Sequence, residues 1–329
     1  MAKKSGSKKD LQDLMIFRHK EGPKGKKPDN FLVEKTNTTD KIKITNRLST
    51  QGTHYRYSIL LDNENSTPIS NIKISVFYPK LLKFTGSYPL SVIISSLIED
   101  KKEKNNVINL EMKGLKDKTS QRIYLHYTPS SQLDNGEFKT SLKYTNNKGE
   151  ENTINSNSIN IKIDDIVIIP KIISHSRIRE ISQIPGMKRA LISLGIGTKK
   201  KVNYKKIFEI FENLVLSYDF QFITRDKEKG IFWFFGFETK SSNDILSLCK
   251  IGSNVIEIIT YSTNPIILGF FLYSFTKNLK QQLSSYKIIN PKTKIFELDC
   301  VNCGETLPYF PKKDESITCI KCSYEQIVW

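Results

Sequence analysis

Between residues 36 and 169, most segments that are rich in apolar residues alternate apolar and polar positions. Alternation with a period of two predicts β-strands that are buried on one face, because successive side chains of a strand point to opposite sides. No stretch of this region repeats apolar residues at helical spacing. The pattern predicts seven antiparallel strands, at residues 42–44, 54–61, 72–77, 108–112, 123–127, 138–144 and 159–163.

Turn-forming residues separate these strands at 62–65, 134–136 and 146–149. Seven short alternating strands within one domain are typical of an immunoglobulin-like β-sandwich. The disulfide and core tryptophan of antibody domains are absent, as in many intracellular sandwiches. We therefore predict an immunoglobulin-like sandwich over residues 36–169, preceded by a basic disordered tail over residues 1–35.

After a connector at residues 170–187 the pattern changes. A strand is predicted at 189–194, a helix at 204–216 and a second helix at 265–283, where Pro265 suits the first helical turn. Four more strands lie between the helices, at 220–223, 231–237, 245–249 and 255–261. This order predicts a small α+β platform over residues 188–288, with an antiparallel sheet and helices on one face.

The strand at 231–237 is apolar on both of its faces, and two helices can cover only one of them. Trp233 and Phe235 point to one face, so they either form ordinary core or contact a partner. If they contact a partner, Arg177 and Arg179 of the connector are further candidates for that binding site.

Four cysteines near the end form a C-x2-C-x15-C-x2-C pattern: Cys300, Cys303, Cys319 and Cys322. Two such pairs can place four thiolates around one metal ion, and Gly304 suits the turn that this needs. We predict a zinc ribbon over residues 296–329, holding one structural Zn²⁺ because no ligand position stays open for water. Two disulfides are the alternative. Cys249 is expected to be a core residue.

The chain has 329 residues and a formal net charge of +17, with 51 Lys and Arg. Such a charge favours nucleic acid or an anionic membrane surface as a partner. Only 8 of these residues are Arg, the side chain that most often binds bases and phosphates. The competing interpretation is therefore a lysine-rich composition without any such partner. Residues 294–329, which include the predicted ribbon, carry a net charge of −2, which does not suit phosphate binding.

No run of apolar residues is long enough to cross a bilayer, and no signal-like segment follows Met1. We expect a cytoplasmic protein, with the tail as a possible contact to a membrane surface. The four His are scattered, and known catalytic motifs are absent. Gly195 and Gly197 are interpreted as a turn before a helix. We expect no enzymatic activity.

Three segments resemble the appendage (ear) domains of vesicle-coat proteins, namely residues 61–74, 243–250 and 255–273. The order of a sandwich followed by a platform is also similar, above all to the coatomer gamma-subunit appendage and then to the clathrin-adaptor ears. The resemblance implies a protein-interaction module that recruits partners, including regulators of small GTPases, in vesicle-mediated transport. This chain lacks the family's α-solenoid trunk and adds a zinc ribbon, which fits a free-standing adaptor, such as an archaeal relative of the eukaryotic machinery.

Two other functions remain open. A nucleic-acid-associated protein would use the tail and the lysines of residues 199–206, and its binding would fall steeply with salt. An accessory subunit of an enzyme would use the ribbon as a contact surface.

Overall fold

The computed structural model describes residues 41–89, 91–99, 105–130, 134–197, 203–289 and 294–329. The predicted tail, residues 1–35, lies outside these ranges, as do the lysines at 199–201. The described part contains four sheets, and every strand pair in them is antiparallel.

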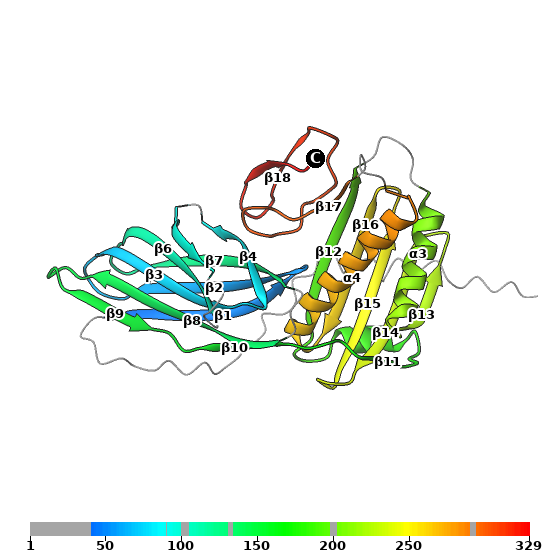
Figure 1. Cartoon of the computed structure of the whole chain (residues 1–329), viewed down its shortest axis with the longest axis horizontal. Coiled ribbons are helices and arrows are strands. Elements are labelled where there is room, and N and C mark those ends of the chain that lie inside the picture. The colour runs from blue at the N-terminus through cyan, green and yellow to red at the C-terminus, as the bar shows by residue number, and fades with distance from the viewer. Residues whose placement is uncertain (1–40, 90, 100–104, 131–133, 198–202, 290–293) are drawn as a thin grey trace, which may run out of the picture. The chain divides into compact units, whose positions relative to one another are not determined.

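Two of the sheets form the predicted immunoglobulin-like sandwich (Figure 1). One sheet has the order β1–β2–β7–β4, with strands at Ile42–Gln51, His54–Asn63, Thr119–Pro129 and Leu82–Tyr88. The other has the order β10–β8–β3–β6–β5, with strands at Ile159–Ile163, Asp134–Thr145, Ile69–Pro79, Asn105–Leu115 and Ile93–Ile98. A further strand, β9 (Glu151–Asn155), pairs with β8. The predicted fold class is confirmed.

The alternating pattern accounts for the sandwich core, because every second residue of a strand points inward. Tyr55, Tyr57, Ile59 and Leu61 of β2 are all buried. Tyr57 stacks on Phe138 of the opposite sheet, with their ring centroids 4.5 Å apart. Burying a large apolar side chain contributes roughly 1.5–3 kcal/mol, so these residues hold the two sheets together.

The sequence pattern does not predict β4, β5 or β9, and one predicted turn is wrong. Residues 134–136 extend β8 and pair with β10. This position of the strand requires a glycine, because a Cβ on Gly136 would come within 2.3 Å of the Pro79 Cβ. The glycine therefore marks a close approach between two segments and not a reversal of the chain.

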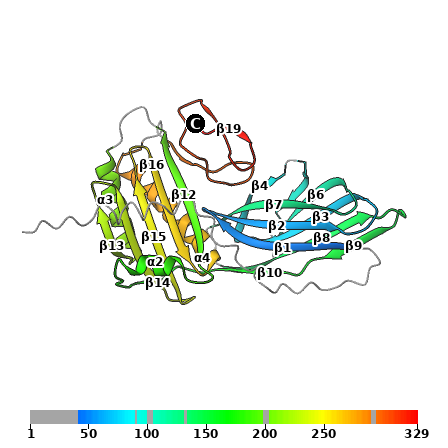
Figure 2. The same ribbon diagram turned by 180° about the vertical axis from the view of Figure 1, so that it is seen from behind.

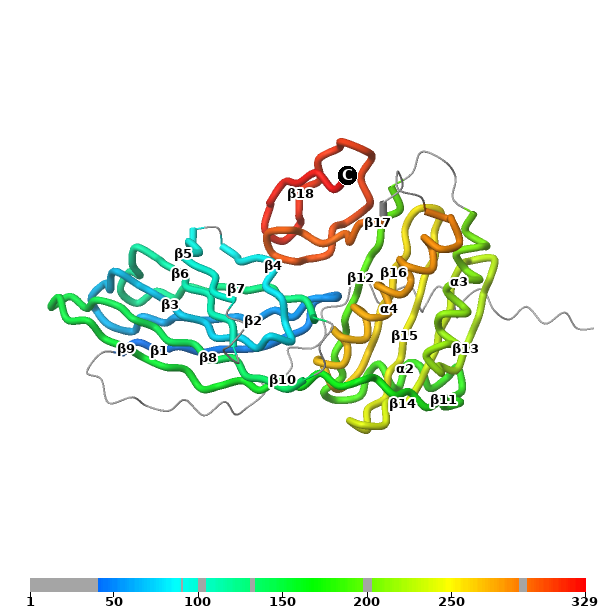
Figure 3. The backbone as a smooth tube through the Cα atoms, in the orientation of Figure 1, coloured from blue at the N-terminus to red at the C-terminus, as the bar shows by residue number. Residues whose placement is uncertain are grey.

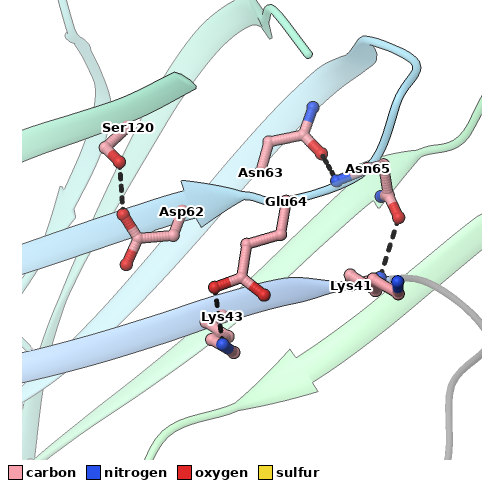
Figure 4. Close-up of polar contacts among 7 residues, drawn as sticks. All are labelled: Lys41, Lys43, Asp62, Asn63, Glu64, Asn65 and Ser120. Atoms are coloured by element: carbon pink, nitrogen blue, oxygen red, sulfur yellow. Dashed lines mark hydrogen bonds and ion pairs between the residues drawn. The ribbon is translucent and has the colours of Figure 1, made fainter. Parts of the chain in front are cut away.

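The predicted turn at residues 62–65 begins too early, because Asp62 and Asn63 are the last residues of β2. The segment from Glu64 onward connects β2 in one sheet to β3 in the other (Figure 4). The Asn63 side chain accepts a hydrogen bond from the Asn65 amide at 3.1 Å, and Asn65 Oδ1 accepts one from the Lys41 amide at 2.8 Å. Glu64 pairs with Lys43 at 2.5 Å. These contacts hold the turn as a crossover between the two sheets.

The third sheet has the order β11–β14–β15–β16–β12–β17, and β13 pairs with β14. Its strands are Ile168–Pro170, Ile231–Glu238, Asn243–Ile251, Val255–Ser262, Lys188–Gly197, Lys294–Glu297 and Gln221–Asp226. The sequence pattern predicts the five strands of this sheet between residues 188 and 262. The two remaining strands, β11 and β17, are short. β11 joins the sheet from the end of the range predicted as sandwich, and β17 joins it from the segment that leads into the ribbon.

Helices α3 (Tyr204–Ser217) and α4 (Pro265–Ser285) cover one face of this sheet, as predicted (Figure 1). Asn203 and Asn264 cap them, and each side chain accepts a hydrogen bond from a backbone amide of the first turn. Phe232 and Phe234 of β14 pack under the helices. The short helix α2 (Arg177–Ser182), which the pattern does not predict, packs on the opposite face (Figure 2).

The C-terminal segment forms a ribbon that contains β18 (Ser316–Thr318) and β19 (Glu325–Ile327), and Figure 3 shows its looped path. Its core is small and is built around three apolar residues, Leu298, Leu307 and Ile317, and three of the cysteines.

Candidate functional site

Two turns in the ribbon share one backbone geometry, and each carries a pair of cysteines. The carbonyl of Cys300 accepts a hydrogen bond from the Gly304 amide at 2.7 Å, and that of Cys319 accepts one from the Ser323 amide at 2.9 Å. Gly304 and Ser323 both have positive φ, +68° and +56°. Each turn therefore folds both of its cysteines toward the same side.

The four sulfur atoms gather at one point. The distance is 3.6 Å between the Sγ atoms of Cys300 and Cys322, and also 3.6 Å between those of Cys303 and Cys319. A tetrahedral site with metal–sulfur bonds of about 2.3 Å has edges of roughly 3.8 Å. A disulfide needs about 2.05 Å, and all four cysteines are free. The cluster is thus compatible with a metal site, and the disulfide alternative does not hold in this structure.

The surroundings of the sulfurs also suit a bound cation. Burial raises the pKa of the Cys300 and Cys303 thiols, so these groups form thiolates readily only beside a positive charge. A metal ion supplies that charge. Asn302 Nδ2 donates to the Sγ of Cys322 at 3.5 Å, a contact that would orient this ligand.

Gly195 and Gly197 of β12 form the surface on which the ribbon packs, called its seat below. Both lie within a strand, so their interpretation as a turn before a helix is wrong. A Cβ on Gly195 would lie 2.4 Å from the Phe310 ring, and one on Gly197 would lie 2.8 Å from the Trp329 ring. Phe310 and Trp329 stack on each other at 5.4 Å. Only a strand without side chains at these positions lets the rings lie flat against it.

The tip of the β1–β2 hairpin contacts both the ribbon and the segment that leads into it. Gln51 Nε2 donates to the carbonyl of Gly304. Thr53 Oγ1 donates to Glu297 Oε2 at 2.8 Å, and Lys280 of α4 pairs with the other oxygen of Glu297 at 2.8 Å. One hairpin thus joins the sandwich to the platform sheet and to the ribbon.

Trp233 and Phe235 lie together beneath α2, where they pack with Ile178 and Ile181 of that helix. Trp233 is 9% exposed and Phe235 is 1% exposed. The second face of the strand is therefore covered by the connector of the same chain.

Arg177 and Arg179 are exposed, on the side of α2 that faces away from the buried Ile178 and Ile181. Arg177 pairs with Glu180 at 3.7 Å. The cation over the aromatic face is instead Lys171, whose Nζ lies 5.8 Å from the Phe235 ring centroid and 5.4 Å from that of Phe237.

Sequence reasoning missed a second group of metal-ligand side chains, His54, Glu297 and Asp299, whose donor atoms lie within 4.8 Å of one another. His54 begins β2, whereas the two carboxylates flank Leu298 at the start of the ribbon. No spacing along the chain relates residues that are so far apart, so only the folded structure reveals the group.

Comparisons with known proteins give weak structural matches. No protein-family model matches the sequence, and no curated protein matches it significantly. An immunoglobulin-like protein from Nocardia farcinica is 11% identical, with a TM-score of 0.26. The match covers 37% of this chain and 98% of the Nocardia protein. The GAE domain of GGA2p from Saccharomyces cerevisiae is 17% identical, with a TM-score of 0.24. The match covers 39% of this chain and 96% of that domain. A cohesin module from a Clostridium perfringens family 33 glycoside hydrolase is 11% identical, with a TM-score of 0.30. The match covers 38% of this chain and 98% of that module. The fold assignment above rests on the strand order.

Within the described ranges, no helix combines the length and the apolar character needed to cross a membrane.

Proposed function

We propose that this chain is a non-enzymatic adaptor that recruits partner proteins, in the manner of a vesicle-coat appendage in intracellular trafficking. A sandwich followed by a sheet with two helices on one face supports the proposal, because this is the layout that the sequence shares with the coatomer gamma-subunit and clathrin-adaptor appendages. We place the chain among free-standing adaptors of this kind, without a coat trunk.

The observation that carries the proposal is the exposed edge strand β5. It pairs with β6 on one side, and no described strand pairs with its other side. Four large apolar residues on it are strongly exposed: Ile93 62%, Ile94 40%, Leu97 46% and Ile98 50%. Natural proteins protect such edges unless they use them, since an open edge accepts a further strand. The partner would add an extended segment beside β5.

The cysteine cluster has a structural role in this proposal. Four thiolates at tetrahedral spacing suit Zn²⁺, and with four protein ligands the ion would have no open position for catalysis. We propose one structural Zn²⁺ held by Cys300, Cys303, Cys319 and Cys322. Its binding energy would supply the folding energy that the small core of the ribbon lacks.

A second contact for partners is proposed at α2. Trp233 and Phe235 become available only if α2 moves away, whereas Arg177 and Arg179 are exposed as they stand. An acidic partner segment would bind the two arginines first. The basic tail is proposed to add an attraction to an anionic membrane surface or to an acidic partner, since the chain carries a net charge of +17.

The test is affinity capture from native lysate with the full-length protein, split into nuclease-treated and untreated halves. Three variants are compared with wild type: Ile93→Lys with Ile98→Lys, Arg177→Glu with Arg179→Glu, and the control Ile172→Lys with Leu216→Lys. Ile172 is 85% exposed, Leu216 is 51% exposed and both lie outside β5, so the control adds the same charge elsewhere. We expect a set of proteins that survives nuclease, is lost with the β5 variant and is kept by the control.

The alternative functions predict different results. A nucleic-acid-associated protein would capture a set of proteins that is lost after nuclease treatment and is the same for all variants. An identical nuclease-resistant catch from wild type and the β5 variant would reject β5 as the docking edge. Loss with the arginine variant alone would move the partner site to α2.

A further inference from the structure

A second cluster of metal-ligand atoms lies away from the cysteines, at the contact between the β1–β2 hairpin and the start of the ribbon. His54, Glu297 and Asp299 each contribute one ring nitrogen or carboxylate oxygen, and these atoms lie within 4.8 Å of one another. All three side chains are half-buried, so solvent can still reach them. The distances are short enough for small side-chain rotations to bring all three atoms to one ion, at bonds of about 2.0–2.2 Å.

The backbone holds the hairpin against this cluster. Gly52, at the tip, has φ +56°, and a Cβ on it would lie 3.2 Å from the Leu191 carbonyl oxygen and 3.5 Å from Asp299 Oδ2. A glycine at the tip thus lets His54 approach the two carboxylates closely. Thr53 Oγ1 bridges His54 Nδ1, at 3.2 Å, and Glu297 Oε2, at 2.8 Å. Such a hydroxyl orients ligands from the second layer of a metal site.

Lys280 is the basic residue that pairs with this cluster among the described residues. Lys280 pairs with Oε1 of Glu297, which leaves Oε2 facing the hairpin. Asp299 makes no ion pair with any residue in the described ranges. One ammonium group thus faces two carboxyl groups, and a bound cation would favour the ionised form of both.

We propose that His54, Glu297 and Asp299 bind a second divalent metal ion of the zinc class, which ties the sandwich hairpin to the start of the ribbon. One imidazole nitrogen with two carboxylate oxygens suits Zn²⁺ or Co²⁺, whereas Ca²⁺ and Mg²⁺ prefer oxygen ligands alone. Water would complete the coordination. The site is independent of the proposed adaptor function.

Cobalt titration of the full-length, metal-free protein tests this proposal. Co²⁺ bound to the four cysteines gives intense thiolate-to-cobalt absorption, whereas Co²⁺ bound to nitrogen and oxygen gives only weak bands. We expect two equivalents to bind, one with the thiolate bands and one without. The His54→Ala variant should bind only the first, with its thiolate bands unchanged. His175→Ala, which alters an exposed histidine of the connector, should bind both.

The thiolate bands also report that the ribbon of each variant is folded. If His54→Ala loses them, Asp299→Asn takes its place, and the dissociation constant of the second equivalent should rise at least about tenfold. Binding of a single equivalent by wild type overturns the proposal. Two equivalents with an unchanged second constant in both folded variants would also overturn it.

Discussion

One histidine shows how strongly the contact with the ribbon changes a residue. His126 lies on the strand β7, opposite Arg56, on the outer face of the four-stranded sheet. The fold nevertheless buries it. Burial lowers the pKa of His126 to about 4, and the nearby charges of His54, Arg56 and Lys321 act in the same direction. The folded protein therefore keeps this imidazole neutral at pH values where the unfolded chain protonates it.

The first prediction follows from this lowered pKa. The contribution of His126 to stability is complete above pH 6.5 and is lost as the pH falls toward 4, because only the unfolded chain takes up the proton. With a pKa of about 4 against an ordinary value of 6.5, the loss reaches about 3 kcal/mol at pH 4. Urea unfolding of wild type and His126→Gln at pH 7 and pH 4 measures the difference. An equal loss of stability in both proteins would contradict the assignment.

Gly195 provides a second prediction at this scale. Gly195→Ala places a Cβ 2.4 Å from the Phe310 ring, which stacks on Trp329 and has little room to shift. We expect the variant to lose about 1–3 kcal/mol of unfolding free energy. Gly86→Ala, where a Cβ meets nothing within 4 Å, should change it by no more than about 0.5 kcal/mol. Thermal melts compare them, and equal midpoints would reject the proposed seat of the ribbon.

The elements of this chain differ in how they obtain their stability. Helix α3 carries six buried apolar residues on one face and a capping asparagine, so packing on the sheet stabilises it. The ribbon has short strands of three residues and a small core. With the proposed Zn²⁺ in place, one ion would hold both cysteine turns, so the ribbon would be the element that depends most on a metal ion.

Removal of the metal should therefore unfold the ribbon alone. After treatment with a chelator, trypsin is expected to cleave at Lys312, Lys313 and Lys321 while the sandwich and platform stay intact. Cys319→Ser should give the same pattern without a chelator. Cys249→Ser is the matched control, because Cys249 is buried in the platform sheet away from the cluster. Mass spectrometry of the fragments identifies the cuts, and a resistant ribbon in chelated protein would contradict the prediction.

At the scale of the whole molecule, the sandwich and the platform share buried contacts. Ile266 and Phe270 of α4 pack against the sandwich core. Tyr55 donates a hydrogen bond to the carbonyl of Ile266 at 2.7 Å, and burial raises the pKa of Tyr55, which keeps the hydroxyl protonated as a donor. Gly269 allows this approach, since a Cβ there would lie 3.0 Å from the Tyr55 ring.

The corresponding prediction concerns cooperative unfolding. Tyr55→Phe removes one hydrogen bond and leaves a carbonyl unpaired, so we expect a loss of about 1 kcal/mol. Circular dichroism and tryptophan fluorescence should show the same shift, because the sandwich and the platform unfold together. Tyr286→Phe, at a residue that is 63% exposed, should shift neither signal. Two separate transitions in the wild type would show that these contacts do not couple the units.

Local sequence patterns determined much of this protein. Alternation located the main sandwich strands, helical spacing predicted α3 and α4 to within two residues, and the cysteine spacing predicted the cluster of four sulfurs. These features succeed because each depends on residues that are close along the chain. The prediction that Trp233 and Phe235 share one face of their strand holds for the same reason.

Only the tertiary structure decided which surfaces meet. The edge strand β5 escapes prediction because neither of its faces is buried, so it has no alternation. The burial of Trp233 depends on α2, a helix of six residues with little local signal. The group of His54, Glu297 and Asp299 and the seat at Gly195 join segments that lie far apart in the chain. Their contacts arise from packing, which no local spacing records.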